Sequence, residues 1–516
     1  MRVKTVITGL VAIVWVGSVY SLHKRTSDRS FLEDGARVDV VTDEFIVRED
    51  YLGVYLNDQK IGYSAFVLKE AGKETASAAG GRVYLFTLES ALQINAMGIS
   101  VPVKIYSFGS VDEGLRLRDF SFSFEASGQR ITSVGVVEGN VLRVTTRSEG
   151  SEHVQEYPIT GSLYSPDVVH LVAARQGLAP GKEWTFPIYD ALTTSTGDVT
   201  IRVGGRETIE WAGEKRDTYH LTLSYKGLQE DAWVNEGGDV YREQSSIGGI
   251  SFVAARETKD QALRLEPATT ISADLIAAST IPVERQIDDP AQVKLMTAVV
   301  SGCQPSDLVF DGIVQTLGKT DPDGSFIVTV RRPDYASVLE QHDTPEVAYA
   351  GSGDFRAYLE PEPLIQSHDE RVRAKAREIS EGAATRWEAV ARISDWLHTS
   401  IRKEPRVTIP SAVEVLQSLR GDCNEHSTLF TALARSLGIP TKLCAGIVYQ
   451  EGAFYYHAWN EVLIGDNDPV WLPVDSTLGR TYVDATHLKL NEGSLDKQVE
   501  LVKLIGTIRL RILDVS

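Results

Sequence analysis

Cysteine is scarce in this chain, and the scarcity limits what can hold the fold together. The 516 residues include three cysteines, Cys303, Cys423 and Cys444, which is too few for the disulfide framework of small secreted domains. A Cys303 to Cys444 bridge is conceivable, but Cys444 falls in the middle of a predicted strand, which disfavours it. No spacing of cysteine and histidine matches a zinc site. We therefore predict neither a disulfide scaffold nor a zinc-binding fold.

Positive charge is also in short supply. The chain has 52 lysines and arginines against 71 aspartates and glutamates, and its formal net charge is −19. Because nucleic acids bind to basic surfaces, they are not expected partners. The length and the 42% share of hydrophobic residues exceed what one core normally organises, so we expect about two to four globular domains.

The N-terminus carries a hydrophobic segment. An uncharged, largely apolar run from Thr5 to Leu22 follows Arg2 and Lys4, and it is long enough to cross a bilayer. Because no Ala-x-Ala-like cleavage site follows, we predict that residues 1–30 form an uncleaved single-pass membrane anchor. Basic residues flank the run on both sides, but large acidic domains translocate regardless of loop charge. We therefore expect an inner-membrane protein with its soluble body in the periplasm.

Residues 45–265 show the alternation of β-strands. Segments such as 61–68, 83–94 and 101–108 have a period of two, and turn residues separate them. We predict an antiparallel β-rich domain curled over a core, followed by a smaller β module at residues 284–333. No motif in either region carries catalytic chemistry, so packing is the default interpretation and binding is the alternative.

Helices and strands are combined in residues 364–516, which we predict to be an α+β domain. A helix is expected from Cys423 to a stop at Gly438-Ile439-Pro440, with helically spaced apolar residues at Leu429, Phe430, Leu433 and Leu437. Three strands are expected next, at 441–449, 454–464 and 470–474. On the second strand, period two puts His457, Trp459 and Glu461 on one face. Asp475 follows the third strand, and antiparallel pairing would bring it beside His457.

Cys423, His457 and Asp475 supply the three groups that a thiol nucleophile needs. Only the thiolate attacks a carbonyl, and a free thiol with a pKa of about 8.5 is mostly protonated at neutral pH. A helix N-terminus at Cys423 and a neighbouring imidazolium would both favour the anion. The sequence therefore predicts Cys423 as nucleophile, His457 as general base and Asp475 as the group that orients the ring.

These segments resemble the transglutaminase-like superfamily, in its bacterial envelope type, which shares a papain-like Cys-His-Asp arrangement. The matching segments are Gly421-Asp422-Cys423, Leu437-Gly438-Ile439-Pro440, His457 to Glu461 and Trp471 to Asp475. The resemblance covers about the last third of the chain. It implies the same three roles for Cys423, His457 and Asp475, with an acyl-enzyme intermediate and no cofactor.

Other residues compete for parts of this site. His426 lies one turn into the same helix as Cys423 and lacks a partner strand, so we interpret it as structural. The resemblance implies an oxyanion-stabilising group upstream of the cysteine, for which Trp387, Trp396 and Gln417 are candidates. The helical spacing of Trp396 favours core packing instead, and the backbone amide of Cys423 is the expected donor.

A calcium site at Asp466-Asn467-Asp468 is a further possibility, since oxygen-rich loops bind calcium. The segment lacks the twelve-residue pattern ending in glutamate, and the same residues simply make turns. We therefore predict a turn there and no metal site.

The expected reaction is hydrolysis of a peptide or amide in a peptide or protein substrate that the sequence does not identify. Transfer of the acyl group from a protein glutamine to an amine is the main alternative, because no residue separates attack by water from attack by an amine. A catalytically silent envelope scaffold and a calcium-dependent binding module are alternatives from other classes.

Overall fold

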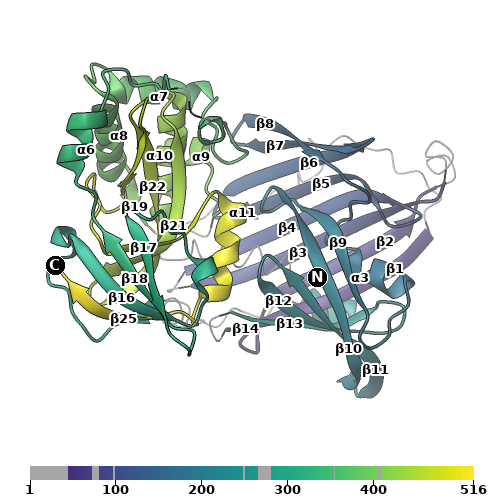
Figure 1. Cartoon of the computed structure of the whole chain (residues 1–516). Helices are drawn as coiled ribbons and strands as arrows, with labels where there is room; N and C mark the ends of the chain where they lie inside the picture. The colour runs from purple at the N-terminus through teal and green to yellow at the C-terminus, as the bar shows by residue number, and fades with distance from the viewer. Residues whose placement is uncertain are drawn as a thin grey trace.

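The computed structural model describes residues 45–72, 81–96, 99–247, 250–264, 280–351, 353, 355–404 and 408–516. The predicted membrane anchor at residues 1–30 lies outside these ranges. Within them, no helix is both long and apolar enough to cross a bilayer. The described chain forms two lobes, one β-rich and one with the helices (Figure 1). One continuous apolar core extends from the β-rich lobe into the sheet of the other.

One antiparallel sheet of fourteen strands makes up the N-terminal lobe, which confirms the predicted β-rich architecture. Two meanders, β1 to β8 and β9 to β14, meet where β1 pairs with β14. Two short helices, α3 (Val169–Arg175) and α4 (Lys259–Ala262), accompany the sheet. The strands are β1 (Phe45–Leu56), β2 (Gln59–Glu70), β3 (Val83–Ala96), β4 (Ile99–Asp112), β5 (Leu117–Ala126), β6 (Gln129–Glu138), β7 (Val141–Ser148), β8 (Ser151–Pro158), β9 (Glu183–Asp190), β10 (Ser195–Trp211), β11 (Glu214–Tyr225), β12 (Leu228–Val234), β13 (Val240–Ile247) and β14 (Ile250–Arg256).

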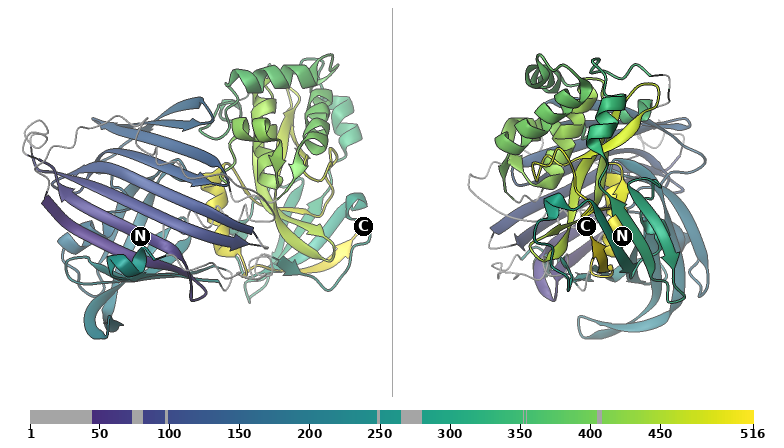
Figure 2. Two further views of the ribbon diagram at one scale, coloured as in Figure 1. Left: turned by 180° about the vertical axis from the view of Figure 1, so that it is seen from behind. Right: turned by 60° about the vertical axis from the view of Figure 1, so that its left-hand side comes forward.

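The sheet is curled (Figure 2), and its buried apolar side chains belong to the core cluster. Alternation along β5 buries Phe120, Phe122 and Phe124, as expected for a strand with one face in the core. The ring of Tyr189 on β9 lies 5.2 Å from that of Phe120 and 5.2 Å from that of Tyr157 on β8. Because β8 and β9 are the two edges of the sheet, these contacts show that its edges approach each other.

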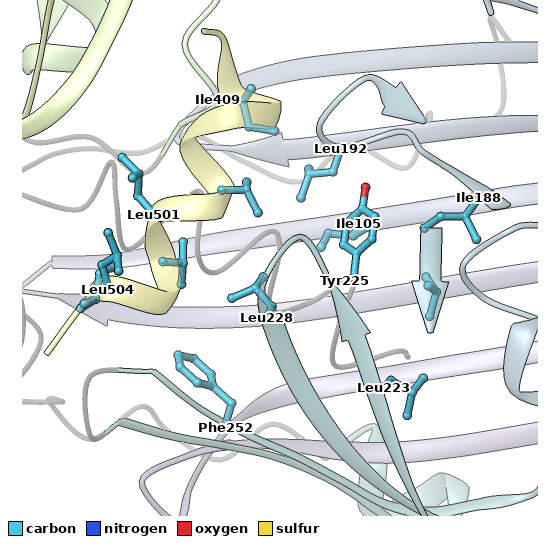
Figure 3. Close-up of a cluster of buried hydrophobic side chains, with 14 of the residues drawn as sticks. Ile105, Ile188, Leu192, Leu223, Tyr225, Leu228, Phe252, Ile409, Leu501 and Leu504 are labelled. Carbon is cyan, nitrogen blue, oxygen red and sulfur yellow. The ribbon is translucent and has the colours of Figure 1, made fainter. Parts of the chain in front are cut away.

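A short segment near the C-terminus enters the curled sheet from the other lobe. It consists of α11 (Leu495–Gln498) and the 3-10 helix η4 (Val499–Leu504). Figure 3 shows Leu501 and Leu504 of this segment near Leu228 and Phe252 of the sheet. Both leucines are 2% exposed. The catalytic candidate region and the β-rich lobe therefore share one core rather than being joined by a free linker.

A second, four-stranded sheet lies beneath the helical lobe. Its order is β17 (Gln315–Thr320), β18 (Phe326–Arg331), β16 (Leu295–Ser301) and β25 (Arg509–Val515). The region predicted as a small β module, 284–333, supplies three of these strands, and the end of the chain supplies the fourth. The sheet is tied to the helical lobe by the side chain of Gln315, which accepts from the N–H of Lys489 (2.8 Å) and donates to its carbonyl (2.7 Å).

Helices pack against a five-stranded sheet in the remaining part, which is the predicted α+β domain (Figure 1). The predicted helix and strands agree with the structure to within a residue at each end. The strands are β15 (Thr280–Pro282), β21 (Thr441–Gln450), β22 (Ala453–Ile464), β23 (Val470–Val474) and β24 (His487–Glu492), and the helices are α6 (Tyr335–His342), α7 (Glu370–Ser380), α8 (Arg386–Ser400), α9 (Ala412–Ser418) and α10 (Cys423–Ser436). Short elements complete the lobe: β19 (Arg402–Lys403), β20 (Arg420–Gly421), η1 (Pro290–Gln292), η2 (Pro305–Asp307) and η3 (Arg356–Tyr358).

Two minor alternatives from the sequence concern the pairing of the cysteines and the loop Asp466-Asn467-Asp468. All three cysteines are free, so the conceivable bridge between Cys303 and Cys444 is not formed. In the loop considered for calcium, the Asp466 carboxylate accepts a hydrogen bond from the wholly buried guanidinium of Arg386 at 2.7 Å. Arg386 also donates to three backbone carbonyls. That carboxylate therefore holds the loop against α8.

Candidate active site

Cys423 occupies the first position of α10, and the residues before it explain why. The Asp422 carboxylate accepts from the Asn424 N–H (3.0 Å), while the Asp422 N–H donates to the Glu425 carboxylate (2.9 Å). This reciprocal capping box fixes the start of the helix. A Cβ on Gly421 would lie 2.3 Å from Cβ of Glu425, so only glycine fits beside the cap. The backbone N–H of Cys423 is one of the first in the helix and has no intrahelical acceptor.

His457 and Asp475 meet between β22 and the end of β23. His457 Nε2 lies 2.8 Å from Asp475 Oδ2, and the Leu478 N–H donates to Oδ1 of the same carboxylate at 3.0 Å. Asp475 is wholly buried. Because a carboxylate only accepts, His457 Nε2 carries the proton, which leaves Nδ1 as an acceptor. This is the tautomer that a general base for a thiol needs.

The helix with Cys423 is bound to the strand with His457 by one buried side chain. Asn460 Nδ2 donates to Thr431 Oγ1 at 2.8 Å and to the carbonyl of Ser427 at 3.1 Å. The thiol of Cys423 lies close enough to the backbone N–H of Ala458 to interact with it. No hydrogen bond joins Cys423 to His457 in the part of the chain that the structure describes. The thiol thus faces the strand that carries His457, at the neighbouring residue Ala458.

The electrostatics of Cys423 differ from the expectation based on a helix N-terminus. Burial raises the pKa of its thiol well above the usual range, and the Asp422 carboxylate adds to this effect. The N–H of Ala458 lowers the pKa of the thiol, but by less than burial raises it. Cys423 is 8% exposed and His457 is 6% exposed, so little water reaches either group. The raised pKa means that the resting side chain of Cys423 is a neutral thiol.

A second histidine, His487 on β24, also contacts Asp475, and the sequence did not indicate it. Its Nε2 lies 3.1 Å from Asp475 Oδ2, and its Nδ1 lies 3.5 Å from Asp484 Oδ1. Burial would lower the pKa of His487, but Asp484 and Asp475 outweigh it and raise the pKa to about 9. Burial likewise opposes ionisation of Asp475, yet His457 and then His487 hold the pKa of its carboxyl well below the usual range.

His457, Asp475 and His487 offer three nitrogen or oxygen atoms within 4.8 Å of one another, a closeness that metal ligands also show. Here the two hydrogen bonds to a single carboxylate oxygen account for the spacing. Trp459 packs against both imidazoles. Its ring is nearly parallel to His457 at 6.3 Å and edge-on to His487 at 5.3 Å.

The competing residues lie apart from this arrangement. His426 Nδ1 faces the carbonyl of Asp422 at 2.6 Å, and burial lowers the pKa of its ring to about 4. Trp396 packs under Lys375 of α7, and Gln417 is exposed on α9. Trp387 packs against the rings of Tyr335 and Tyr482, which also contact each other. The backbone amide of Cys423 therefore stays the expected oxyanion donor.

The sequence of this region also matches a known family model. Residues 373–476 match the model of the transglutaminase-like superfamily. The chain carries a transglutaminase-like domain. The match includes α10, β22 and all three predicted site residues, whereas β24 with His487 follows it. The comparison with curated proteins gives no match.

Solved structures resemble parts of the chain at low identity. A proposed cysteine protease from Cytophaga hutchinsonii has 16% identity and a TM-score of 0.28, over 43% of this chain and 86% of that protein. A β-barrel-like protein of a domain family of unknown function from Brucella abortus has 12% identity and a TM-score of 0.29, over 40% and 94%. A proposed protease from Parabacteroides distasonis has 10% identity and a TM-score of 0.19, over 80% and 63%. At these scores the likenesses carry no argument about substrate or reaction.

Replacing Asn460 by leucine should loosen the transglutaminase-like domain at the point where α10 meets β22. The loss of its hydrogen bonds to Thr431 and Ser427 is expected to cost about 1 to 3 kcal/mol of stability. If Cys423 is the nucleophile, as the sequence predicts, its displacement should also lower kcat by about 100-fold. Thermal unfolding and peptide turnover measure the two effects. Asn491→Leu, on the more exposed end of β24, should preserve turnover, and equal effects of both variants would contradict the role of Asn460.

The raised pKa of His487 predicts a loss of stability in alkaline solution. The folded-state pKa of about 9 exceeds the unfolded value of about 6.5, so the protonated ring stabilises the fold fully below the unfolded pKa. The contribution, on the order of 3 kcal/mol, is lost as the pH rises through the folded pKa. Urea unfolding at pH values between the unfolded and the folded pKa of His487 should show this loss of stability in the wild type and not in His487→Gln. If the free energy of unfolding depended on pH in the same way in both proteins, the stabilising role of protonated His487 would be contradicted.

Proposed function

We propose that the transglutaminase-like domain is a thiol hydrolase of the peptidase or amidase type. The observation that carries this proposal is the 2.8 Å hydrogen bond from His457 Nε2 to the buried Asp475 carboxylate. It fixes the ring so that Nδ1 can accept a proton, and α10 holds a cysteine with its helix N-terminus beside the same strand. The match of residues 373–476 to the transglutaminase-like superfamily supports the same chemistry.

The first half of the reaction forms an acyl-enzyme. Cys423 Sγ attacks the carbonyl carbon of the substrate amide while its proton moves to His457 Nδ1. The carbonyl oxygen becomes an oxyanion, which the free N–H of Cys423 at the helix start stabilises. The C–N bond then breaks, the leaving amine takes the proton from His457, and a thioester remains on Cys423.

The second half releases the product and restores the thiol. Water attacks the thioester as His457 removes one of its protons, the C–S bond breaks, and the proton returns to sulfur. Throughout, Asp475 holds the ring and stabilises its protonated form. Because the resting thiol is neutral by virtue of burial, proton transfer to His457 accompanies the attack. This resembles the general-base activation of a serine more than a preformed ion pair.

The site is proposed to act outside the cytoplasm, in the periplasm, with residues 1–30 as the membrane anchor. The support is the uncharged run from Thr5 to Leu22 and the acidic net charge of −19. Protease added to spheroplasts should digest the body of the protein if it lies outside the inner membrane. Protection until the membrane is broken would place the body in the cytoplasm instead.

A peptide library tests the reaction. The full chain in detergent is incubated with the library, with and without methylamine, and products are compared by mass with those of Cys423→Ala. Hydrolysis predicts products one water heavier in total than the substrate, and these depend on Cys423. Methylamide products would show acyl transfer to amines instead, which is the alternative reaction of the same site. Identical products for the wild type and Cys423→Ala would overturn the proposed enzymatic activity and favour a binding scaffold.

A further inference from the structure

Two histidines form hydrogen bonds to the same carboxylate oxygen atom of Asp475. His457 Nε2 lies 2.8 Å and His487 Nε2 lies 3.1 Å from Oδ2. The other oxygen, Oδ1, accepts from the Leu478 N–H at 3.0 Å. Both imidazoles are therefore donors toward the same buried carboxylate. A conventional Cys-His-Asp site requires only the first of them, so His487 needs a separate explanation.

The far side of His487 faces a second carboxylate. Its Nδ1 lies 3.5 Å from Asp484 Oδ1, and Arg480 forms an ion pair with the other oxygen of Asp484. An imidazole with a carboxylate at each nitrogen is held in its protonated form, and its pKa is raised to about 9. His487 is 5% exposed. A buried cation thus lies directly behind the carboxylate that orients the candidate base.

Besides the two histidines, Lys403 also interacts electrostatically with Asp475, but Lys403 is exposed to solvent whereas His487 is buried. A cavity between the four-stranded sheet and β24 is lined by His487 and by other charged residues, namely Asp311, Arg331, Glu461, Asp484 and Lys489. Lys489 binds both oxygens of Glu461 at 2.7 and 2.9 Å. Its charge is therefore matched within its own pair. Trp459 separates this pair from His457 along β22 and packs edge-on against His487.

We propose that His487 is a positioning residue of the hydrolase: it fixes the Asp475 carboxylate and limits how strongly that carboxylate draws a proton onto His457. This proposal rests on the proposed function for the role of His457. The physical reason is that a cation beside Asp475 offsets part of its negative charge. Without a cation beside it, the full negative charge of Asp475 would make His457 hold its proton too firmly to return it to the leaving amine. With Asp475 unanchored, the ring of His457 would lose its orientation.

The test replaces His487 by glutamine, which keeps an N–H donor but removes the charge. Histidines of the full chain are labelled with ¹³C at Cε1 and titrated by NMR, and the His457 signal is assigned from its absence in His457→Gln. The midpoint at which His457 takes up its proton is expected to move to higher pH by about one unit in His487→Gln. His426→Gln, which removes a nearby neutral ring, is the matched control and should leave the midpoint in place.

A second variant covers the case in which His487→Gln does not fold. Asp484→Asn weakens the protonation of His487 without touching Asp475, and it should move the His457 midpoint in the same direction by a smaller amount. An unchanged midpoint in every folded variant would overturn the proposal. The titration needs no substrate, so it is separate from the library experiment. Absence of Cys423-dependent products would overturn the proposed hydrolase activity. The midpoint of the His457 titration alone decides whether His487 acts on His457.

Discussion

Replacing Cys423 by alanine is expected to abolish both turnover and acyl-enzyme formation. In the proposed mechanism neither of the other two cysteines can replace Cys423, because Cys303 and Cys444 are both buried and neither lies at the start of α10. Removal of a nucleophile that works together with its base costs about 10⁶-fold in the best-studied case of this chemistry. Turnover of a peptide from the library and the intact mass of the protein during the reaction measure the loss.

The matched controls for this variant are the other two cysteines. Cys303→Ala and Cys444→Ala remove the same atom from buried sites outside the proposed machinery, so each should retain turnover wherever the protein folds. Cys423→Ala should keep the melting temperature of the wild type, since a small side chain at a helix start is replaced by the best helix former. Retained turnover in Cys423→Ala would contradict the assignment of the nucleophile.

Asp475→Asn should lower kcat by about 10⁴-fold while the substrate still binds. The asparagine amide donates to the nitrogen that now donates to Asp475, so His457 would carry its proton on Nδ1, facing the thiol. The ring could no longer accept the proton of Cys423. His487 would also lose one of its two carboxylates. Steady-state kinetics separates the fall in kcat from any change in KM.

The same substitution in an exposed position provides the control for Asp475→Asn. Asp468 lies exposed in the loop before β23, and Asp468→Asn should leave both kinetic constants unchanged. A fall in kcat of less than about tenfold in Asp475→Asn would show that the Asp475 carboxylate does not orient His457. A large rise in KM with unchanged kcat would assign Asp475 to substrate binding instead.

Local patterns in the sequence predicted the part of the helical lobe that carries Cys423, His457 and Asp475, namely α10 and β21 to β23. The helix after Cys423 follows from apolar residues at helical spacing, and Asp422 and Glu425 fix its first residue through the capping box. The pairing of β22 with β23 follows from two alternating segments joined by a short turn. It brings Asp475 to His457 because antiparallel neighbours must lie side by side. Each of these relations is local.

Relations between distant segments were not predictable in the same way. His487 reaches Asp475 only because β24 pairs with β21, across a connection that has no periodic pattern. The joining of β1 to β14 and the entry of Leu501 and Leu504 into the curled sheet also depend on packing between distant segments. Alternation predicts that a strand has a buried face, but not which segment covers that face.

The electrostatics of the nucleophile show a further limit of sequence patterns. A helix N-terminus does favour an anion, but its effect is smaller than the desolvation of a thiol that is 8% exposed. The extent of burial depends on how β22 packs over α10, which the sequence does not show. The pKa of Cys423 is therefore raised rather than lowered, and the proposed mechanism assigns its activation to His457.

The most direct measurement of this dependence is the rate at which iodoacetamide alkylates Cys423 near neutral pH, in the wild type and in His457→Ala, followed by peptide mass. If His457 removes the thiol proton, the wild type should be labelled at Cys423 well before Cys303 and Cys444, and His457→Ala should be labelled much more slowly. Equal labelling rates in the two proteins would contradict the activation of Cys423 by His457 and with it the proposed enzyme.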